Sequence, residues 1–224
     1  KMRKSTDQGI SWGPVVTAAS LIGRGVNGNL GITTGFRSNS FPQVVNHPTL
    51  PNVLYAVFND VVSTAAGADS NCYFVTSTDG GSTWSAKTTI NTVTNRYQYF
   101  PTIAVSPAGN YLYVGWYDKR RDAANFLIDR WGRIATIDGA GVATFQAADF
   151  LVTTKQFRPY FGQDPVVNTT YMGDYDQARM DDDYIYDTWG DNSIATVLKP
   201  AGQADIRQAR IPVAGPGPNL VYTS

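Results

Sequence analysis

The stretch Ser77-Thr78-Asp79-Gly80-Gly81-Ser82-Thr83-Trp84 decides the fold, because the chain contains it twice. The earlier copy, Ser5-Thr6-Asp7-Gln8-Gly9-Ile10-Ser11-Trp12, is identical at five of its eight positions and lies 72 residues upstream (79 − 7). Self-similarity at such a spacing is typical of repeat architectures, in which each copy belongs to one supersecondary unit. We therefore expect several similar units along the chain.

A second family of segments alternates with the first. Leu54–Asp60, Leu112–Asp118 and Ile185–Asp191 share an aliphatic residue, a tyrosine, two variable residues, an aromatic residue, one variable residue and an aspartate. The copies are 58 and 73 residues apart (118 − 60 and 191 − 118), and each follows another recurring segment that begins with an aromatic residue. The second aromatic residue of each copy is expected in the core between units.

These runs are short, rich in β-branched and aromatic residues, and bounded by Gly, Pro, Asn and Asp, which favours strands and turns. Four such runs in about 55 to 70 residues suit one four-stranded antiparallel blade of a β-propeller. In chain order, the expected strands are 41–46, 52–59, 71–77 and 84–90, then 100–105, 111–117, 125–136 and 142–153, then 171–178, 183–189 and 204–211. The sequence thus predicts a single all-β domain with a partial blade at 1–20, blades at 38–92 and 97–155, and a final blade at 168–224.

The composition disfavours several other classes. All 18 acidic residues are Asp, they balance 18 Lys and Arg, and only 16% of the chain is charged. The absence of Glu disfavours a helical bundle, and a neutral chain has no overall field to attract nucleic acid. No apolar run reaches the ~18 residues of a membrane-spanning helix. Cys72 is the only cysteine and is expected to be buried, and the single histidine, His47, disfavours His-rich zinc sites.

The repeated octet resembles the Asp-box, also called the bacterial neuraminidase (BNR) repeat, of sialidase-like β-propellers. The residues that carry the resemblance are Ser5, Asp7, Gly9, Trp12, Ser77, Asp79, Gly81 and Trp84. The resemblance implies a closed ring of six blades, of which about three and a half are visible in this sequence. Because proteins avoid open sheet edges, we expect upstream blades, or another chain, to complete the ring.

The octet also has a mechanical interpretation, as the turn between the third and fourth strands of a blade. Asp79 is suited to accept backbone N–H bonds across its own turn, and Gly80 or Gly81 can supply a positive φ. Trp84 is expected to bury its ring beside the fourth strand. The corresponding residues of the first copy, Trp12 included, are expected to do the same.

Ligand sites of propellers lie near the central axis, and here we expect one at the strand ends away from these turns. The candidate ligand-binding residues end a second strand or precede a first strand: Arg37, Arg96, Tyr97, Tyr99, Asp118, Arg120 and Arg158. Structural alternatives stand beside them. Asp60, Asp118 and Asp191 occupy one position in every unit, which favours turn caps, and residues 119–122 are expected to form a solvated loop.

The run Asp181-Asp182-Asp183 raises the question of a metal site. Carboxylates are the ligands that Ca²⁺ prefers. Three consecutive carboxylates do not converge on one ion without help, so a solvated turn is favoured. No other metal or cofactor is expected.

The resemblance to sialidases implies three arginines that clamp a carboxylate, a tyrosine nucleophile, a glutamate that activates it, and an aspartate acid/base. Arginine matches a carboxylate bidentately, and a phenol with a pKa of ~10 needs a nearby base. This chain has no Glu, and its Arg210-Ile211-Pro212 stands near the C-terminus rather than in a first blade. The candidates for an enzyme are Tyr171 or Tyr175 as nucleophile, Asp174 as base, and Arg96 and Arg158 as clamp.

Three functions stay open. The favoured hypothesis is a non-catalytic sialidase-like propeller, either an extracellular, periplasmic or cell-surface scaffold or a module that binds carbohydrate. The alternatives are the C-terminal part of an exo-glycosidase that removes terminal sialic acid, and a structural assembly subunit. A nucleic-acid partner and a membrane span are not expected.

Overall fold

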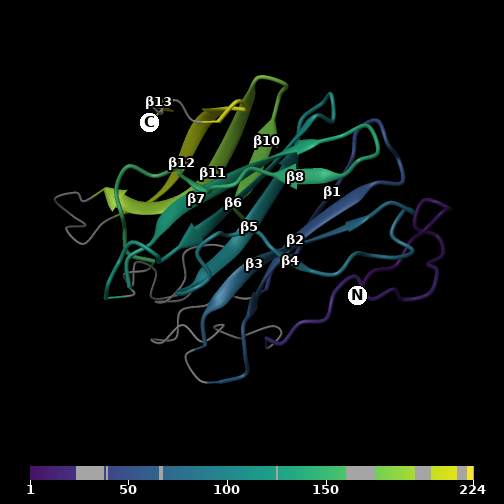
Figure 1. Cartoon of the computed structure of the whole chain (residues 1–224), viewed down its shortest axis with the longest axis horizontal. Helices are drawn as coiled ribbons and strands as arrows, with labels where there is room; N and C mark the ends of the chain where they lie inside the picture. Colours follow the sequence, from purple (N-terminus) through teal and green to yellow (C-terminus); the bar gives the residue numbers. More distant parts are fainter. Residues whose placement is uncertain are drawn as a thin grey trace.

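The computed structural model describes residues 1–23, 38, 40–65, 68–124, 126–159, 175–194, 203–215 and 221–223. Within these ranges the chain is all β, contains no helix, and forms three antiparallel sheets (Figure 1). The all-β class predicted from the sequence is therefore confirmed. The described segments include no helix that could serve as a membrane span.

Each sheet is built from consecutive strands. The first sheet contains β1 (Gln43–Asn46), β2 (Leu54–Val61), β3 (Ser70–Ser77) and β4 (Thr88–Thr89). The second contains β5 (Gln98–Val105), β6 (Tyr111–Asp118), β7 (Asp129–Ile137) and β8 (Ala143–Phe145), with β9 (Phe150–Leu151) also paired to β7. The third contains β10 (Gln177–Met180), β11 (Tyr184–Ile194), β12 (Gln203–Pro212) and β13 (Val221–Thr223).

The predicted first, second and third strands of every unit overlap observed strands, whereas the fourth strands differ. The first sheet keeps only the two residues of β4 from the predicted 84–90, because the preceding residues remain in the turn. The predicted 142–153 splits into β8 and β9, which pair with different parts of β7. The repeat pattern predicts no fourth strand for the last unit, where the structure has β13.

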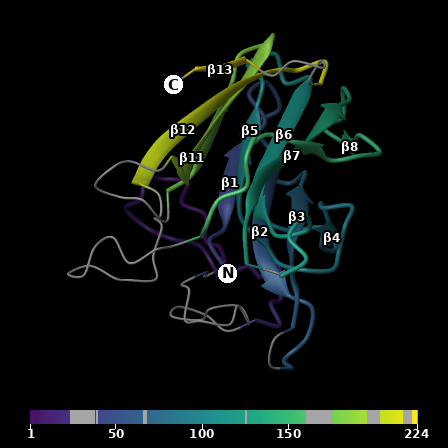
Figure 2. The same cartoon turned by 90° about the vertical axis from the view of Figure 1, so that its left-hand side faces the viewer.

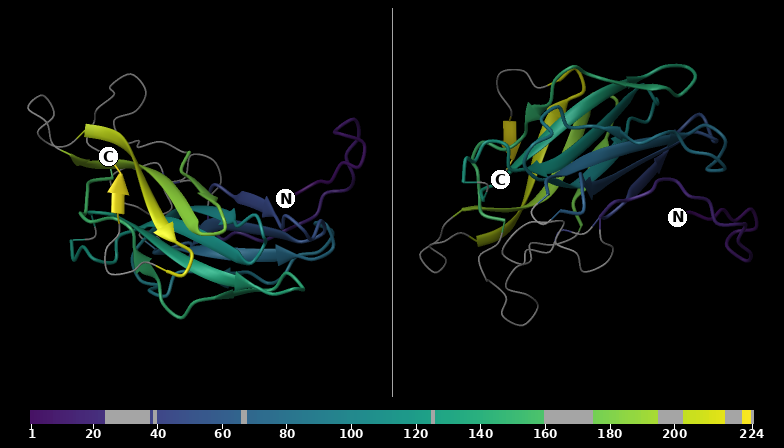
Figure 3. Two further views of the ribbon diagram at one scale, coloured as in Figure 1. Left: turned by 90° about the horizontal axis from the view of Figure 1, so that it is seen from above. Right: turned by 60° about the horizontal axis from the view of Figure 1, so that its bottom comes forward.

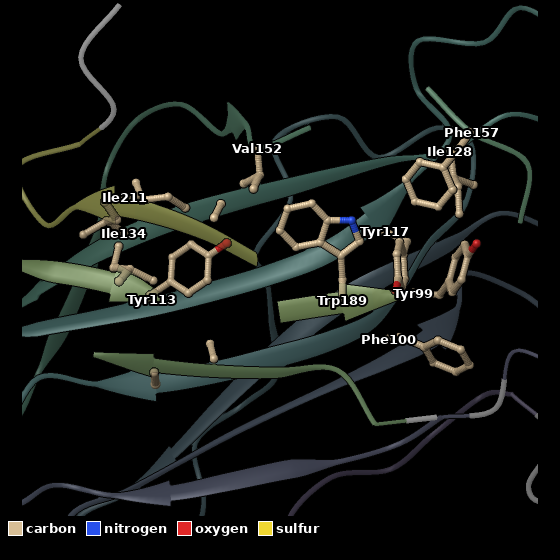
Figure 4. Close-up of a cluster of buried hydrophobic side chains, with 14 of the residues drawn as sticks. Tyr99, Phe100, Tyr113, Tyr117, Ile128, Ile134, Val152, Phe157, Trp189 and Ile211 are labelled. Atoms are coloured by element: carbon tan, nitrogen blue, oxygen red, sulfur yellow. The ribbon is translucent and has the colours of Figure 1, made fainter. Parts of the chain in front are cut away.

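The sheets pack against one another and bury an apolar layer at each junction. Tyr55 and Trp116 lie in the layer between the first and second sheets, together with Cys72, whose thiol is buried as expected. Tyr113 and Trp189 lie in the layer between the second and third sheets (Figure 4). The expected burial of an aromatic residue in every second strand is confirmed for all three units.

The N-terminal segment packs on the face of the first sheet that is turned away from the second sheet. Phe58 is buried in a small third cluster, against which Met2, Ala19 and Trp84 pack. The third sheet lies at the other end of the stack, with the two ends of the chain far apart (Figures 2 and 3).

The first strands of the three sheets converge on one side chain. The Gln43 amide on β1 accepts hydrogen bonds from Thr102 Oγ1 (3.0 Å) and the Ile103 backbone N–H (3.3 Å) on β5. Its Nε2 donates to the backbone carbonyl of Asp176, directly before β10, at 3.0 Å. β1, β5 and β10 are therefore the inner strands, and the sheets fan outward from them.

The repeated octets form the same turn in both copies. Asp79 Oδ1 accepts the Thr83 backbone N–H at 2.9 Å, and Asp7 Oδ1 accepts the Ser11 N–H at 2.9 Å. Gly80 and Gly81 have φ of 68° and 88°, so the expected carboxylate turn with positive φ is confirmed. These hydrogen bonds, led by that of the Thr83 hydroxyl, lower the pKa of Asp79 to about 2.

The two turns differ in how far their tryptophans are covered. Trp84 is half-buried, packs against the cluster that contains Phe58, and donates its indole N–H to the Gly81 carbonyl at 3.2 Å. Trp12 is 58% exposed. The expectation that Trp12 buries its ring is wrong in the described part of the chain, because Trp12 is not among the residues that pack against a described core cluster there.

Candidate functional site

Several predicted site residues lie outside the described residues. These are Arg37, Tyr171 and Asp174, so their roles stay predictions. Tyr175 is described and is 88% exposed at the start of the last inner strand. Arg158 is exposed, with its guanidinium 6.0 Å from the Phe126 ring centroid. Arg96 is partly buried before β5, and the carboxylate clamp of Arg96 and Arg158 stays a prediction.

The aspartates that end the second strands are buried turn caps. Asp118 accepts the Trp116 indole N–H at 3.0 Å and the Arg120 backbone N–H at 2.7 Å. Asp191 accepts the Trp189 indole N–H at 3.1 Å and a backbone N–H two residues on at 2.7 Å. This repeated arrangement confirms the structural alternative for both residues.

Asp60 has a different set of donors. It accepts the backbone N–H groups of Ile22 and Gly23 at 2.8 and 2.6 Å, and the Lys87 ammonium at 2.9 Å. In the first sheet, the equivalent carboxylate therefore ties the N-terminal segment to the strand end.

The expectation of a solvated loop at 119–122 is wrong for Lys119 and Arg120, whose side chains are buried, whereas Arg121 is exposed as expected. Lys119 is 3% exposed and its ammonium lies 5.0 Å from the centroid of the Tyr97 ring. Burial lowers the pKa of Lys119 to about 8. Arg120 forms ion pairs with Asp118 at 2.6 Å and Asp149 at 2.7 Å and lies over the Trp131 ring. These cations are held within the second sheet rather than presented to solvent.

The segment that enters β5 is conformationally unusual. Arg96 and Phe100 both have positive φ, 75° and 49°, although neither is glycine. The pairing of β5 with β6 shifts register between Tyr99 and Thr102, which marks a bulge. The tyrosines before and after Gln98 in the sequence, Tyr97 and Tyr99, are both buried. Burial raises the pKa of both phenols. The Tyr99 ring lies 5.5 Å from the ring of Tyr117, and Arg130 Nη1 lies 3.5 Å from the Phe100 carbonyl oxygen, so this segment borders the candidate site that contains Tyr117 and Arg130.

The candidate site is a cluster of charged and phenolic side chains between the second and third sheets, which we call the inter-sheet cluster: Tyr113, Tyr117, Arg130, Asp176 and Asp187. Arg130 on β7 binds Asp187 on β11 bidentately, with Nε–Oδ2 and Nη2–Oδ1 distances of 2.9 and 3.0 Å. Its Nη1 lies 3.5 Å from Asp176 Oδ2, and its guanidinium lies 4.9 Å from the Tyr117 ring centroid.

Each carboxylate of the inter-sheet cluster also accepts a phenol. The Tyr117 hydroxyl donates to Asp176 Oδ1 at 2.8 Å, and the Tyr113 hydroxyl donates to Asp187 Oδ2 at 2.8 Å. Figure 4 shows both phenols, from β6, in the same layer as Trp189. Arg130 and Asp187 are fully buried, whereas the Asp176 side chain is 11% exposed. Asp176 is therefore the member that solvent reaches.

Burial sets the protonation of the inter-sheet cluster. It raises the pKa of Asp176 to about 6, although Arg130 and the Tyr117 hydroxyl oppose the shift. Burial also raises the pKa of Tyr113 and Tyr117 well above 10, and the neighbouring carboxylates add to this. Burial acts to lower the pKa of Arg130, but Asp187 and Asp176 outweigh it, so the guanidinium stays charged. The cluster thus holds a protonable carboxylate beside two phenols that resist ionisation.

Two glycines make room for the inter-sheet cluster. Gly115 on β6 and Gly132 on β7 are direct cross-strand partners. A Cβ on Gly132 would lie 2.5 Å from the Tyr113 ring, and one on Gly115 would lie 2.7 Å from Asp187 Oδ2. The pair therefore leaves a slot in the second sheet that the Tyr113 phenol and the Asp187 carboxylate fill.

A row of exposed side chains runs along the inner strand of the third sheet. Ala178 is buried towards the second sheet, so Tyr175, Gln177 and Arg179 point to the opposite side by strand alternation. All three are exposed. Tyr175 is thus separated from Asp176 by the strand, one facing solvent and the other the inter-sheet cluster.

Sequence reasoning did not identify the inter-sheet cluster. Arg130 lies within a predicted third strand, between Asp129 and Trp131, so charged residues inside a strand were the available signal. Asp187 breaks the apolar pattern of its second strand in the same way. Their pairing joins residues 57 apart, which no local spacing indicates.

The acidic run at 181–183 is occupied by turn contacts. Asp181 accepts the backbone N–H groups of Asp183 and Tyr184 at 2.9 and 2.6 Å, and Asp182 accepts that of Ala108 at 2.8 Å. Among the described residues, no group of three or more metal-ligating side chains is assembled.

Comparison with known proteins extends this description. No protein-family model matches the chain, and no curated protein matches it. Among solved structures, the Hadza microbial sialidase Hz136 is similar with a TM-score of 0.50 and 12% identity over 92% of this chain. The Phage phi92 endosialidase gives 0.40 and 13% over 77% of this chain. A family 117 glycoside hydrolase from the marine bacterium Zobellia galactanivorans gives 0.43 and 16% over 89%.

This chain covers 37% of the sialidase, 28% of the endosialidase and 58% of the glycoside hydrolase. It therefore spans less than two thirds of the length of each of these proteins. The likeness to the Hadza microbial sialidase, together with three antiparallel sheets around shared inner strands, supports a sialidase-like, propeller-type fold for this chain.

Proposed function

We propose that this chain is part of an extracellular or cell-surface Asp-box propeller that binds carbohydrate without cleaving it. The sialidase-like fold supports a carbohydrate-related role. The two equivalent carboxylate turns support the Asp-box assignment. In this proposal, further blades or another chain complete a ring around β1, β5 and β10.

The observation that carries the proposal is the state of the Tyr117–Asp176 pair. A tyrosine nucleophile needs a carboxylate base that lowers the cost of ionising the phenol. Here the phenol and the carboxylate are 2.8 Å apart, but burial raises the pKa of Tyr117 well above 10 and that of Asp176 to about 6. The raised pKa of Tyr117 makes its phenolate costly to form, although a carboxyl with a pKa of about 6 is ionised at pH 7 and can act as a base. In this proposal the cost of the phenolate decides, and the pair is a hydrogen-bonded support between sheets rather than an activated nucleophile.

The carbohydrate-binding surface in this proposal is an exposed row formed by Tyr175, two residues before β10, and by Gln177 and Arg179 on β10. A tyrosine ring offers an apolar face for a sugar ring, and amide and guanidinium groups donate hydrogen bonds to sugar hydroxyls. Tyr175 is 88% exposed and stands at the strand end where the loops before the inner strands emerge. This location fits the axis of a propeller.

The test uses the intact protein in a fluorogenic sialoside assay and on a glycan array. We expect no sialoside turnover and binding to at least one glycan. Tyr175→Ala and Arg179→Gln should weaken that binding, whereas Ile206→Ala, an exposed change on β12 of the same sheet, should not. Turnover of the sialoside would exclude the non-catalytic part, and unchanged binding by both variants would exclude this surface.

The exo-sialidase alternative has one observation in its favour. The inter-sheet cluster places a tyrosine, a carboxylate and a guanidinium within contact of one another, with Asp176 reached by solvent. If the intact protein hydrolyses sialosides, Asp176→Asn and Tyr117→Phe should each abolish turnover. Retention of turnover by both variants would place the catalytic groups elsewhere.

A further inference from the structure

The two equivalent turns border a common pocket of about 670 Å³. One wall consists of residues 2–4 and 11–14, and the other consists of Leu54 and residues 80–82. Its volume lies in the range of ~300–1,000 Å³ that is usual for small-ligand sites. The turn at 77–84 follows the end of β3, which pairs antiparallel with the start of β2, whereas Asp60 lies near the end of β2. This turn pocket therefore lies at the strand ends away from the aspartate caps.

Two cations line the turn pocket without a carboxylate partner. Arg3 and Lys4 are exposed, and neither forms an ion pair with any carboxylate of the described part of the chain. Asp7 and Asp79, the nearby acids, are held inside their own turns. The Lys4 ammonium lies 2.8 Å from the point where a Cβ on Gly80 would sit, so the glycine is what lets it lie against the opposite wall. Asp7 and Asp79 keep their negative charges, because their pKa values are about 2, so the surroundings of the pocket are not positive overall. The guanidinium of Arg3 and the ammonium of Lys4 are themselves unpaired within the described residues, so each can contact an anionic group of a ligand.

The same pocket offers an aromatic platform and hydroxyl groups. Trp12 lines it while remaining 58% exposed, so its ring is available to a ligand. The hydroxyls of Thr6, Ser11 and Ser82 are also in the lining. An indole face packs against the C–H face of a sugar ring, and hydroxyls exchange hydrogen bonds with sugar hydroxyls. An acidic peptide could pair with the two cations, but it has no sugar ring to pack against the indole and no sugar hydroxyls to bond with the hydroxyls of the lining.

We infer that the turn pocket binds an acidic saccharide, with its carboxylate or sulfate group on Arg3 and Lys4 and a sugar ring against Trp12. The site is separate from the row on β10 and does not depend on the proposed function. Charge–charge contacts here are exposed, so the affinity falls as salt shortens the Debye length to ~10 Å at 0.1 M.

The test titrates the intact protein with three probes at low and physiological salt, followed by tryptophan fluorescence and calorimetry. The probes are a heparin-derived tetrasaccharide, which carries sulfate, tetragalacturonic acid, which carries only carboxylates, and maltotetraose, which is neutral. We expect at least one acidic probe to bind about tenfold more tightly than maltotetraose, an effect of about 1.4 kcal/mol. The stronger acidic probe identifies the anionic group.

The variants locate the site. Trp12→Ala should weaken binding of the acidic probe at least about fivefold, and Arg3→Gln and Lys4→Gln about two- to fivefold each, with a smaller salt dependence. Lys1→Gln and Ile10→Ala are matched controls, because both residues are exposed in the same segment but do not line the pocket. Circular dichroism verifies that every variant folds.

Four results would overturn the inference: no binding of either acidic probe, equal binding of maltotetraose, equal binding of a hexa-aspartate peptide, or wild-type affinity in the Trp12, Arg3 and Lys4 variants. Tyr175→Ala should leave this binding unchanged. A failure here is thus distinguishable from a failure of the proposed function.

Discussion

Replacing Asp176 by Asn should change how stability depends on pH. Burial raises the pKa of this carboxyl from its ordinary 3.8 to about 6, so the folded protein holds the proton more tightly than the unfolded chain does. The contribution of Asp176 to the free energy of unfolding therefore falls as pH rises from about 4 to about 6 and does not change above that range. At ~1.4 kcal/mol for each pH unit, the fall is about 3 kcal/mol.

Asn cannot titrate, and it resembles the protonated carboxyl in shape. The D176N variant should match the wild type near pH 4 and exceed it by about 2–3 kcal/mol at pH 7. Its side-chain oxygen can still accept the Tyr117 hydroxyl. The measurement is urea unfolding at pH 4, 5, 6 and 7, followed by tryptophan fluorescence.

Tyr117→Phe is the matched control. The Tyr117 hydroxyl lowers the pKa of Asp176, so its removal should extend the fall in stability to higher pH and make it larger. A difference between wild type and D176N that stays constant from pH 4 to pH 7 would refute the reasoning, because it would show that Asp176 does not titrate differently on folding.

Three further outcomes are expected. Arg130→Met should cost about 3–5 kcal/mol in urea unfolding, since it leaves a buried carboxylate unpaired, and a loss below about 1 kcal/mol would contradict a buried ion pair. Trp84→Ala should lower the free energy of unfolding by about 2 kcal/mol because the ring is only half-buried, while Trp12→Ala should lower it by under about 1 kcal/mol. Equal losses would argue against the different burial of the two rings. The Asp79 carboxyl carbon should titrate in NMR with a midpoint of about 2 because Thr83 donates two hydrogen bonds to it, and a midpoint near 3.8 would exclude those bonds.

Local chemistry made much of the fold predictable. The Asp79 turn depends on groups within four residues of Asp79, so the octet alone indicates its geometry. The Trp116–Asp118 contact is also local, because strand alternation places residues two apart on the same side. The repetition of these two patterns identified the units and most of their strands.

The candidate site was harder to predict because it depends on how sheets pack. Arg130 and Asp187 meet only because one sheet is stacked on the next, and nothing within either strand indicates the partner. The loop that contains Lys119 and Arg120 has the composition of a solvated turn, yet Asp149 and aromatic rings from other strands enclose it. The exposure of Trp12 likewise follows from what covers it, not from its own octet.

The Gln43 side chain limits which residues can occupy its position. Its carbonyl oxygen accepts two hydrogen bonds from β5 while its amino group donates one to the residue before β10. A glutamate would keep the acceptor and lose the donor, and a lysine would do the reverse. Asparagine has both groups on a shorter arm. Substitution here by any charged residue should therefore loosen one neighbouring strand or the other. The position of this single amide, at the centre of the three sheets, should accept few substitutions.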